Sequence, residues 1–379
     1  MCAVRYAGTL LSGGAVEFLV EDGLIVSVHS IKDSAGLPWI MPVLVDLQQN
    51  GAVGNSFSSL NSPGELRDIA ETLLSHGVGR VQATTVSVPL EELRSSVKMI
   101  ADECARDPLL DRLIFGLFHE GIFISFEDGW RGNHDLENIR KPDWELFCET
   151  DELSGHRITT VNVAPEVPGA MEFISKAAAA GKKVAIGHCN PTPAQVREAV
   201  ERGADRVTHF GNGAAPQIHR FKNPFWACLD EPGLKLGLIC DGFHLPPELV
   251  STAMKIKGRE NCLVVSDASC YSGLKPGIYG DGKRQLEPDG YLHVIGRDIL
   301  AGSSCQQNTC VNFLMRKLGF SFLEAWRQCS VIPAAGIGIR LPEIKVGEEA
   351  SFVIVREGEQ EAIIDRTVFM GREYPFGVK

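Results

Sequence analysis

Four short apolar stretches of this chain each lead to a residue that can bind a metal ion or transfer a proton. In chain order these residues are Glu120, His188, His209 and Asp267. The stretches before them, such as Val184–Ile186 and Leu263–Val265, have the length and composition of buried strands. A (β/α)8 barrel places its catalytic groups where strands meet the following loops. One carboxylate, two imidazoles and a later aspartate in this order therefore predict a metal-dependent hydrolase on such a barrel.

The body of the chain alternates strand-like and helical patterns. Arg80–Thr85 is strand-like, Leu90–Cys104 has the spacing of an amphipathic helix, and Leu113–Leu117 is strand-like again. This alternation is typical of a parallel sheet with crossover helices. Pro288-Asp289-Gly290 predicts a hairpin inserted late in the barrel. The fold class that we predict is α/β, with a TIM-like (β/α)8 barrel as the catalytic part.

Both ends of the chain are rich in strand patterns. Two alternating runs in Val16–Val28 are separated by Glu21-Asp22-Gly23, which predicts a hairpin, and similar runs lie in Ala350–Gly371. At 379 residues the chain has room for a barrel of about 250 residues and an accessory domain. We predict a small β-sandwich from residues 1–41 and 341–379, and a catalytic barrel from residues 42–340.

Composition limits the partners of the protein. The formal net charge is −11, which disfavours nucleic acid and anionic membranes because both attract basic surfaces. We expect no signal peptide near Met1–Val20 and no segment of about 18 apolar residues that could span a bilayer. Eleven cysteines without zinc-finger or thioredoxin spacing indicate reduced thiols and a cytoplasmic protein. The expected partner is a small-molecule substrate.

Glu120, His188 and His209 have the ligand chemistry of a catalytic metal site that keeps one position open. We expect one divalent ion per chain, with zinc as the first choice and iron, cobalt or nickel as alternatives. Asp267 follows its strand at the place where a general acid and base is needed. A strand alternates its side chains, so His119 faces away from Glu120 and is interpreted as structural.

The first barrel strand contains no histidine pair. Asp46, Gln48 and Asn50 share one face of this strand, because side chains alternate. Many metal hydrolases have two histidines at the positions of Gln48 and Asn50. Neutral amides are poor ligands for a zinc-like ion. The sequence therefore predicts one metal ion and not two.

Taken together, the motifs resemble those of N-acetylglucosamine-6-phosphate deacetylases, a branch of the amidohydrolase superfamily. The similarity extends from about Pro42 to Gly371, with motifs in the family's order and close to its spacing. The motifs that carry it are Val45–Gly51, Glu120–Ser125, Gly187-His188, Thr208–Asn212, Asp241–His244, Ser266–Ala268 and Leu300–Ser304.

The resemblance implies a role for each matching residue. Glu120, His188 and His209 match the metal ligands, Asp267 matches the catalytic aspartate, and His244 matches a histidine that contacts the acyl carbonyl. Asn212 and Gly213 match the segment that touches the sugar phosphate. Arg220 matches an arginine that a neighbouring subunit lends to the phosphate, which implies a homodimer. His134 matches a sugar-hydroxyl contact if the loop Phe126–Arg131 contains two extra residues.

The predicted function is metal-dependent deacetylation of an N-acetylated amino sugar phosphate, with N-acetylglucosamine 6-phosphate as the first candidate. Around the cavity the chain departs from the family, since Gly213-Ala214 replaces Ala-Met and Cys270-Tyr271 interrupts a small apolar series. Two alternatives stay open. One is a deacylase of an unphosphorylated N-acyl sugar or amino acid, and the other is a catalytically silent barrel that binds a sugar.

Overall fold

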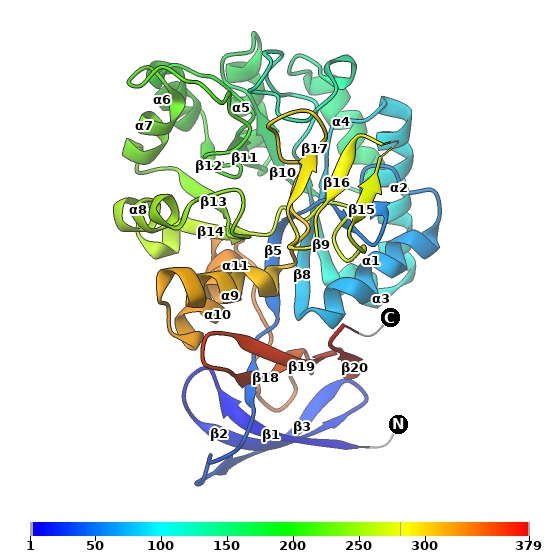
Figure 1. Ribbon diagram of the computed structural model, residues 1–379. Coiled ribbons are helices and arrows are strands. Elements are labelled where there is room, and N and C mark those ends of the chain that lie inside the picture. Colours follow the sequence, from blue (N-terminus) through cyan, green and yellow to red (C-terminus); the bar gives the residue numbers. More distant parts are fainter. Residues whose placement is uncertain (1–2, 281, 378–379) are drawn as a thin grey trace.

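An eight-stranded parallel sheet forms the centre of the structure, which is a computed structural model that describes residues 3–280 and 282–377 (Figure 1). Each strand pairs with its successor along the chain, as right-handed crossover units produce. An isolated bridge between Gln49 and Ala268 joins the first strand to the segment after the last, so the sheet is a nearly closed barrel. The predicted (β/α)8 barrel is confirmed. Its strands are β5 (Leu44–Gln49), β8 (Val78–Thr85), β9 (Ile114–His119), β10 (Ile158–Val163), β11 (Lys183–Ile186), β12 (Ala204–Val207), β13 (Lys235–Ile239) and β14 (Cys262–Val265).

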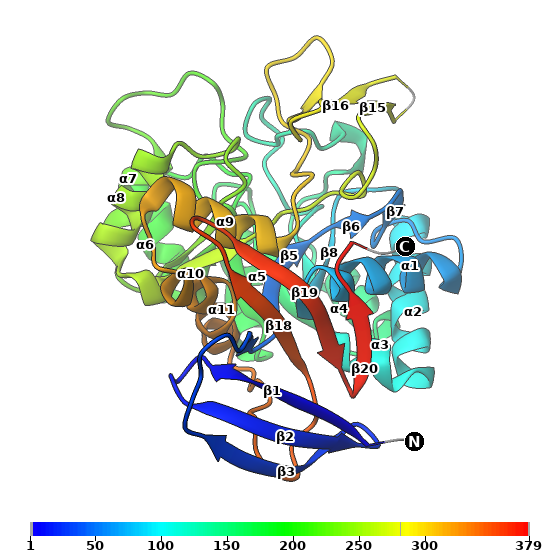
Figure 2. The ribbon, with the colours of Figure 1, turned by 60° about the horizontal axis from the view of Figure 1, so that its bottom comes forward.

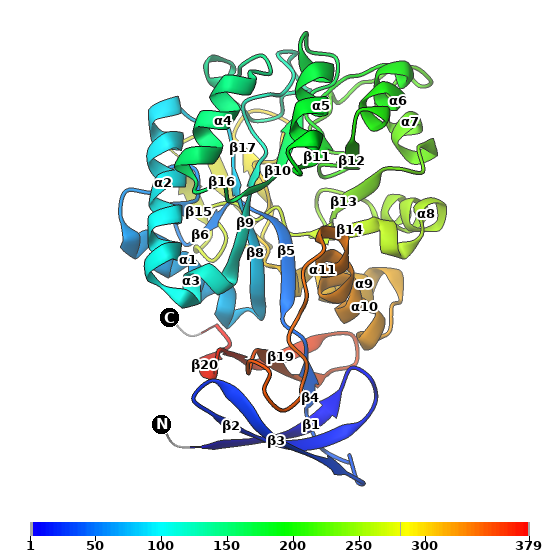
Figure 3. The ribbon, with the colours of Figure 1, turned by 180° about the vertical axis from the view of Figure 1, so that it is seen from behind.

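Helices surround the barrel on its outer face (Figure 3). Their apolar stripes face the sheet; in the second helix, for example, Leu93, Val97 and Ile100 are fully buried. Two helices begin with a complete capping box, Thr192 with Gln195 and Ser321 with Glu324. The helices are α1 (Pro63–Ser75), α2 (Leu90–Arg106), α3 (Pro108–Leu113), α4 (Trp144–Leu153), α5 (Ala170–Ala179), α6 (Pro193–Glu201), α7 (Pro224–Asp230), α8 (Pro247–Lys257), α9 (Gln307–Leu318), α10 (Phe322–Cys329) and α11 (Val331–Ile337), with short 3-10 turns at Leu136–Asn138 and Arg259–Asn261.

Strands from both ends of the chain share one seven-stranded, mostly antiparallel sheet (Figure 2). In sheet order they are β20 (Arg372–Pro375), β19 (Ala362–Phe369), β18 (Phe352–Glu357), β4 (Trp39–Met41), β1 (Val4–Leu10), β2 (Ala15–Glu21) and β3 (Leu24–Ile31). The ring of Phe352 lies 5.1 Å from that of Tyr6 and 5.2 Å from that of Phe18, although β4 separates their strands. The sheet therefore curls around its own apolar cluster. The division of the chain at residues 42 and 340 stays a prediction.

A small three-stranded sheet lies at the end of the barrel away from the terminal strands (Figures 1 and 2). It consists of β15 (Gly277–Tyr279), β16 (Arg284–Leu286) and β17 (Leu292–Val294), and the predicted turn at residues 288–290 joins its last two strands. Leu286, Leu292 and Ala301 form a separate apolar cluster beneath it. A two-residue hairpin of β6 (Gly51–Ala52) and β7 (Asn55–Ser56) follows the first barrel strand. Within the described part of the chain, no helix combines the length and apolar character needed to cross a bilayer.

Candidate active site

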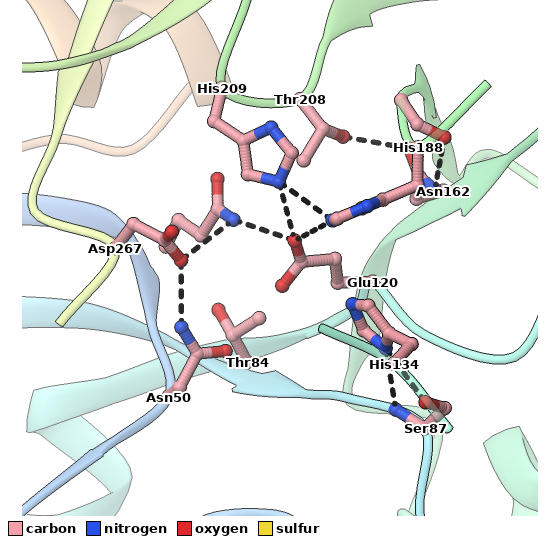
Figure 4. A network of polar contacts seen from close by, with 12 residues as sticks. Asn50, Thr84, Ser87, Glu120, His134, Asn162, His188, Thr208, His209 and Asp267 are labelled. Atoms are coloured by element: carbon pink, nitrogen blue, oxygen red, sulfur yellow. Dashed lines mark hydrogen bonds and ion pairs between the residues drawn. The ribbon is translucent and has the colours of Figure 1, made fainter. Parts of the chain in front are cut away.

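The predicted metal ligands lie at the carboxyl ends of three barrel strands. Glu120 directly follows β9, while His188 and His209 each follow their strand by two residues. Because parallel strands end at the same edge of the barrel, the three side chains meet over its centre (Figure 4). All three are buried.

Three atoms of these side chains converge on one point. Glu120 Oε1 lies 2.9 Å from His209 Nε2 and 3.3 Å from His188 Nε2, and the two nitrogens are 2.9 Å apart. Ligands that share a zinc ion at about 2.0–2.2 Å in a tetrahedral arrangement stand roughly 3.3 Å apart. The donor set and its spacing therefore fit a divalent ion, although its identity is not fixed by them.

A third histidine lies beside this cluster. Donor atoms of Glu120, His134 and His188 all fall within 4.8 Å of one another, so His134 forms a second, wider Glu/His/His group. Its Nδ1 is 2.7 Å from the Ser87 hydroxyl, and its ring packs edge-on against that of His188. The tighter set with His209 is the better metal site because all three of its donor atoms lie within hydrogen-bonding distance of one another.

His188 is fixed by its surroundings on every side. Its Nδ1 is 3.3 Å from the Trp130 carbonyl, which directs a proton to Nδ1 and leaves the lone pair of Nε2 for the cluster. A Cβ atom at Gly213 would stand 2.6 Å from this ring, and one at Gly132 would stand 3.0 Å from it. Both glycines are therefore needed for the ring to fit.

The backbone is left-handed at three of the four predicted residues. The φ angles are +50° at His188, +28° at His209 and +49° at Asp267. Each such conformation costs roughly 1–3 kcal/mol for a residue with a Cβ atom and persists only where the surroundings enforce it. At Asp267 the backbone N–H donates to the Gln48 carbonyl at 3.0 Å, and the Asp267 carbonyl accepts from Ser303 at 2.9 Å.

Gln48 and Asn50 act here as hydrogen-bond donors. The Gln48 amide donates to Glu120 Oε1 at 2.9 Å and to Asp267 Oδ1 at 3.0 Å, and the Asn50 amide donates to the same Asp267 oxygen at 2.8 Å (Figure 4). An N–H group that faces a carboxylate offers no lone pair to a metal ion. The two amides thus connect the candidate catalytic aspartate to the candidate metal ligand Glu120.

Asp267 and Glu120 differ in pKa because their surroundings differ. Burial raises the pKa of Asp267 to about 7, and the negative charge of Glu120 acts in the same direction. Burial also raises the pKa of Glu120, but hydrogen bonds from His188 and His209 outweigh it and hold this pKa well below its usual range. Near neutral pH, Asp267 can therefore accept and release a proton while Glu120 stays ionised.

A second buried aspartate fastens the first barrel strand to the segment that carries Asp267. Asp46 Oδ1 accepts from the backbone N–H groups of Gln48 and Ser266, both at 3.2 Å, and the Ser266 hydroxyl donates to the other carboxylate oxygen. Ser266 Oγ also accepts from Ala268 N–H at 3.0 Å. The residues on both sides of Asp267 are thus held at the seam of the barrel.

His244 follows β13 and is oriented by Asp241. Its Nδ1 lies 2.6 Å from Asp241 Oδ2, and Asp241 Oδ1 accepts from the backbone N–H groups of Phe243 and His244 at 2.9 Å each. Burial raises the pKa of Asp241, but these hydrogen bonds outweigh burial and bring the pKa below its usual value. The carboxylate therefore stays ionised beside the imidazole. The Nε2 of His244 is the ring nitrogen left for a ligand.

A cavity of about 430 Å³ opens above these groups at the carboxyl end of the barrel. Nearly all the predicted site residues line it, namely Glu120, His134, His188, His209, Asn212, Gly213, His244 and Asp267. The buried amide nitrogen of Asn212 has no partner among the described residues, so it is available to a ligand. Sequence reasoning assigned no role to Ser87, Asp241 or Ser266, although the motifs Asp241–His244 and Ser266–Ala268 contain two of them.

Arg220 is the one predicted site residue that does not line this cavity. It lies in an exposed loop, its carbonyl accepts from the Trp226 indole at 2.8 Å, and its guanidinium stacks on the Phe221 ring at 5.3 Å. Phe221 and Trp226 are 72% and 58% exposed, which is unusual for large apolar side chains.

The barrel is a fold that solved enzymes share at low sequence identity. A solved dihydroorotase and a solved enamidase, the second described as a member of the amidohydrolase superfamily, have TM-scores of 0.61 and 0.57 at 14% identity. No family model matches the chain.

The curated relatives are the deacetylases that the sequence motifs resemble, so the predicted resemblance is confirmed. N-acetylglucosamine-6-phosphate deacetylase of Vibrio furnissii is 28% identical over 367 residues, a match that covers 94% of this chain and 90% of that protein. N-acetylgalactosamine-6-phosphate deacetylase of Escherichia coli O157:H7 is 27% identical over 344 residues, covering 89% and 90%.

Solved deacetylases share the whole architecture. The N-acetylglucosamine-6-phosphate deacetylase of Thermotoga maritima has a TM-score of 0.80 at 26% identity, covering 98% of this chain and 99% of that one. A Mycobacterium smegmatis deacetylase variant, solved with N-acetyl-D-glucosamine-6-phosphate, has a TM-score of 0.84 at 22% identity, with coverages of 98% and 99%. At 22% identity the second likeness concerns the fold alone.

Proposed function

We propose that this chain is a metal-dependent deacetylase of N-acetylated amino sugar phosphates, with N-acetylglucosamine 6-phosphate as the first candidate substrate. The observation that carries the proposal is the convergence of Glu120, His188 and His209 beside Asp267, a buried aspartate whose pKa of about 7 suits proton transfer. The names of the curated relatives support the substrate class, but they include both glucosamine and galactosamine derivatives. The sugar epimer is therefore part of the proposal.

Glu120, His188 and His209 would hold one divalent ion, with zinc as the first candidate. When bound, such an ion would act as a Lewis acid and lower the pKa of water. Asp267 takes a proton from the attacking water and returns it to the nitrogen that leaves. Gln48 and Asn50 fix one oxygen of Asp267 by their hydrogen bonds and so leave the other oxygen for this transfer. His244, held by Asp241, presents Nε2 to the acyl carbonyl.

The sugar would be bound by residues on the loops. Asn212 and Gly213 are proposed to hold the phosphate, since the Asn212 amide nitrogen is buried without a partner among the described residues. His134 is proposed to contact a sugar hydroxyl through Nε2, because Ser87 occupies its Nδ1.

We further propose a homodimer in which Arg220 reaches the phosphate in the partner's active site. Support comes from the exposed position of Arg220 and from the exposed rings of Phe221 and Trp226 beside it. Burial of such rings is a common source of interface energy. A cytoplasmic location completes the proposal, supported by ten cysteines that all carry free thiols within the described residues.

A substrate panel tests the proposal. Acetate release is measured from N-acetylglucosamine and N-acetylgalactosamine, each with and without 6-phosphate, and from an N-acetyl amino acid. We expect turnover of the phosphorylated sugars to exceed that of every other compound. Preference for an unphosphorylated compound would move the assignment to another deacylase, and turnover of none would contradict enzymatic function on these substrates.

A further inference from the structure

The described residues that line the cavity above the barrel include four carboxylic acids, four histidines and one arginine. Four carboxylic acids line it: Glu120, Asp135, Asp267 and Asp298. Among the described residues in its wall, Arg284 is the single arginine or lysine. The whole chain carries a formal net charge of −11. Besides the proposed metal ion, a permanent cation in the cavity wall would therefore favour an anionic substituent of the substrate.

Arg284 is held in place by the small inserted sheet. It is the first residue of β16, where it pairs with Tyr279 of β15 on one side and with Val294 of β17 on the other. The apolar cluster under this sheet, which includes Leu286 in the same strand, packs the strand against the neighbouring segments at Tyr271, Leu274 and Ala301. The guanidinium thus extends from a rigid element and not from a free loop.

No carboxylate among the described residues forms an ion pair with the Arg284 guanidinium. The Tyr271 hydroxyl lies close to it: a Cβ atom at Gly280 would stand 2.9 Å from Arg284 Nη1 and 2.8 Å from the Tyr271 hydroxyl. Gly280 has a φ of +59°, so the turn keeps a glycine there and both donor groups approach the same point. A half-buried guanidinium that has no carboxylate partner among the described residues and lies beside a hydroxyl is a donor set for an anion.

We propose that Arg284 binds an anionic oxygen group of the substrate. Arg284 belongs to the same chain as the catalytic residues of this cavity, whereas the proposed Arg220 contact reaches the partner's active site. This inference rests on the proposed function and deepens it, because it names a specificity residue in the cavity's own wall. A guanidinium suits the task since it is permanently charged and presents a planar fork to carboxylate or phosphate oxygens. The group bound is either the 6-phosphate or a carboxylate substituent on a ring hydroxyl, which share this chemistry.

The test compares Arg284→Gln and Arg284→Lys with the wild-type, metal-loaded enzyme. Kinetics are measured on N-acetylglucosamine, its 6-phosphate and an N-acetylated amino sugar with a carboxylate ether on a ring hydroxyl. Arg297→Gln is the matched control, because Arg297 belongs to the same insertion but faces Asp128 at 3.4 Å on the surface. Binding of glucosamine, glucosamine 6-phosphate and the carboxylate sugar by calorimetry gives a readout that does not depend on turnover.

We expect Arg284→Gln to raise KM for the anionic sugar about tenfold to a hundredfold, the usual effect of losing a charge-assisted hydrogen bond. kcat and the kinetics of the neutral sugar should change little, and Arg284→Lys should recover part of the loss. A raised KM for the phosphorylated sugar identifies phosphate as the group that Arg284 binds. A raised KM for the carboxylate sugar alone identifies the carboxylate substituent instead.

Equal KM changes for neutral and anionic sugars would overturn the role of Arg284, as would unchanged KM for both anionic sugars. Failure of the proposed function is a separate result: the wild-type chain then deacetylates none of the sugars. In that case calorimetry with glucosamine 6-phosphate and with the carboxylate sugar still decides. Wild-type protein that binds neither anionic sugar better than Arg284→Gln does overturns the anion site.

Discussion

The two walls of the cavity are built in different ways. The wall formed by strand ends carries Glu120, His188, His209 and Asp267, which are buried and held by several hydrogen bonds each. The second wall, here called the loop wall, consists of loops and the inserted sheet and carries Asn212, Gly213 and Arg284, which are half-exposed. Arg220 lies on an exposed loop outside the cavity. Reaction chemistry thus lies on the buried strand-end wall, and the residues proposed to select the substrate lie in the more exposed segments. Damage to the strand-end wall should abolish the reaction, while damage to the loop wall should change which substrate reacts.

The largest effect is expected for His209→Ala. Its Nε2 lies 2.9 Å from both Glu120 and His188, so the variant loses a third of the donor set. Elemental analysis should show loss of the metal. Replacing a residue that only supports a metal ligand typically lowers activity about 10- to 100-fold, and the loss in His209→Ala should be larger. His119→Asn is the control, because His119 is also buried but bonds to Thr85 outside the cluster. A His209→Ala protein with normal metal content would remove His209 from the ligand set.

Asp267→Asn should separate chemistry from metal binding. The asparagine keeps the size of the side chain and an oxygen for the amides of Gln48 and Asn50, but it cannot accept a proton at neutral pH. Turnover should therefore fall about 10²-fold or more, with metal content and Tm unchanged. Near-normal turnover would assign the proton transfer to another group, with His244 as the next candidate.

The hydrogen bonds of the buried Asp46 carboxyl give the strand-end wall a pH-dependent stability. Burial raises the pKa of Asp46 to about 6 from an ordinary value of 3.8, so the folded chain holds this proton more tightly than the unfolded chain does. The contribution is fully present below pH 3.8 and is lost as pH rises through about 6. It amounts to at most about 3 kcal/mol, since one pKa unit corresponds to about 1.4 kcal/mol.

Urea denaturation of wild type and Asp46→Asn at several pH values measures this effect. The free energy of unfolding of wild type minus that of the variant should fall between pH 4 and pH 7, because the asparagine does not titrate. A difference that stays constant over this range would show that Asp46 titrates alike in both states.

The smallest effect is expected at Arg220, on the exposed loop outside the cavity. Arg220→Ala should lower kcat/KM about ten- to a hundredfold for a phosphorylated substrate, because a charge-assisted contact contributes roughly 1.5–3 kcal/mol. The unphosphorylated sugar should be unaffected. Lys222→Ala in the same exposed loop is the matched control. Equal effects of Arg220→Ala on both sugars, or a fully active monomer, would contradict the proposed contact across a dimer.

The two walls also differ in how far the sequence predicts them. Strand ends gather at one edge of a parallel barrel. The positions of Glu120, His188, His209 and Asp267 at successive strand ends were therefore enough to predict that these residues lie together. The left-handed backbone at His188 and Asp267 could not be predicted, because non-local bonds impose it. Ser266 and Asp241 belong to motifs found in the sequence, but their roles were not predicted, since these roles depend on contacts formed only in the folded chain. Arg220 marks the other limit, because its predicted role requires a second chain.

The central claim, that the strand-end wall holds a single catalytic metal ion, is tested most directly by metal stoichiometry of purified protein. Elemental analysis is performed on wild type, His209→Ala and a Gln48→Ala variant, with acetate release from N-acetylglucosamine 6-phosphate measured on the same samples. We predict one divalent ion per chain in wild type and Gln48→Ala, little metal in His209→Ala, and activity only where metal is retained. Two ions per wild-type chain with one lost in Gln48→Ala, or full activity in metal-free protein, would contradict the account.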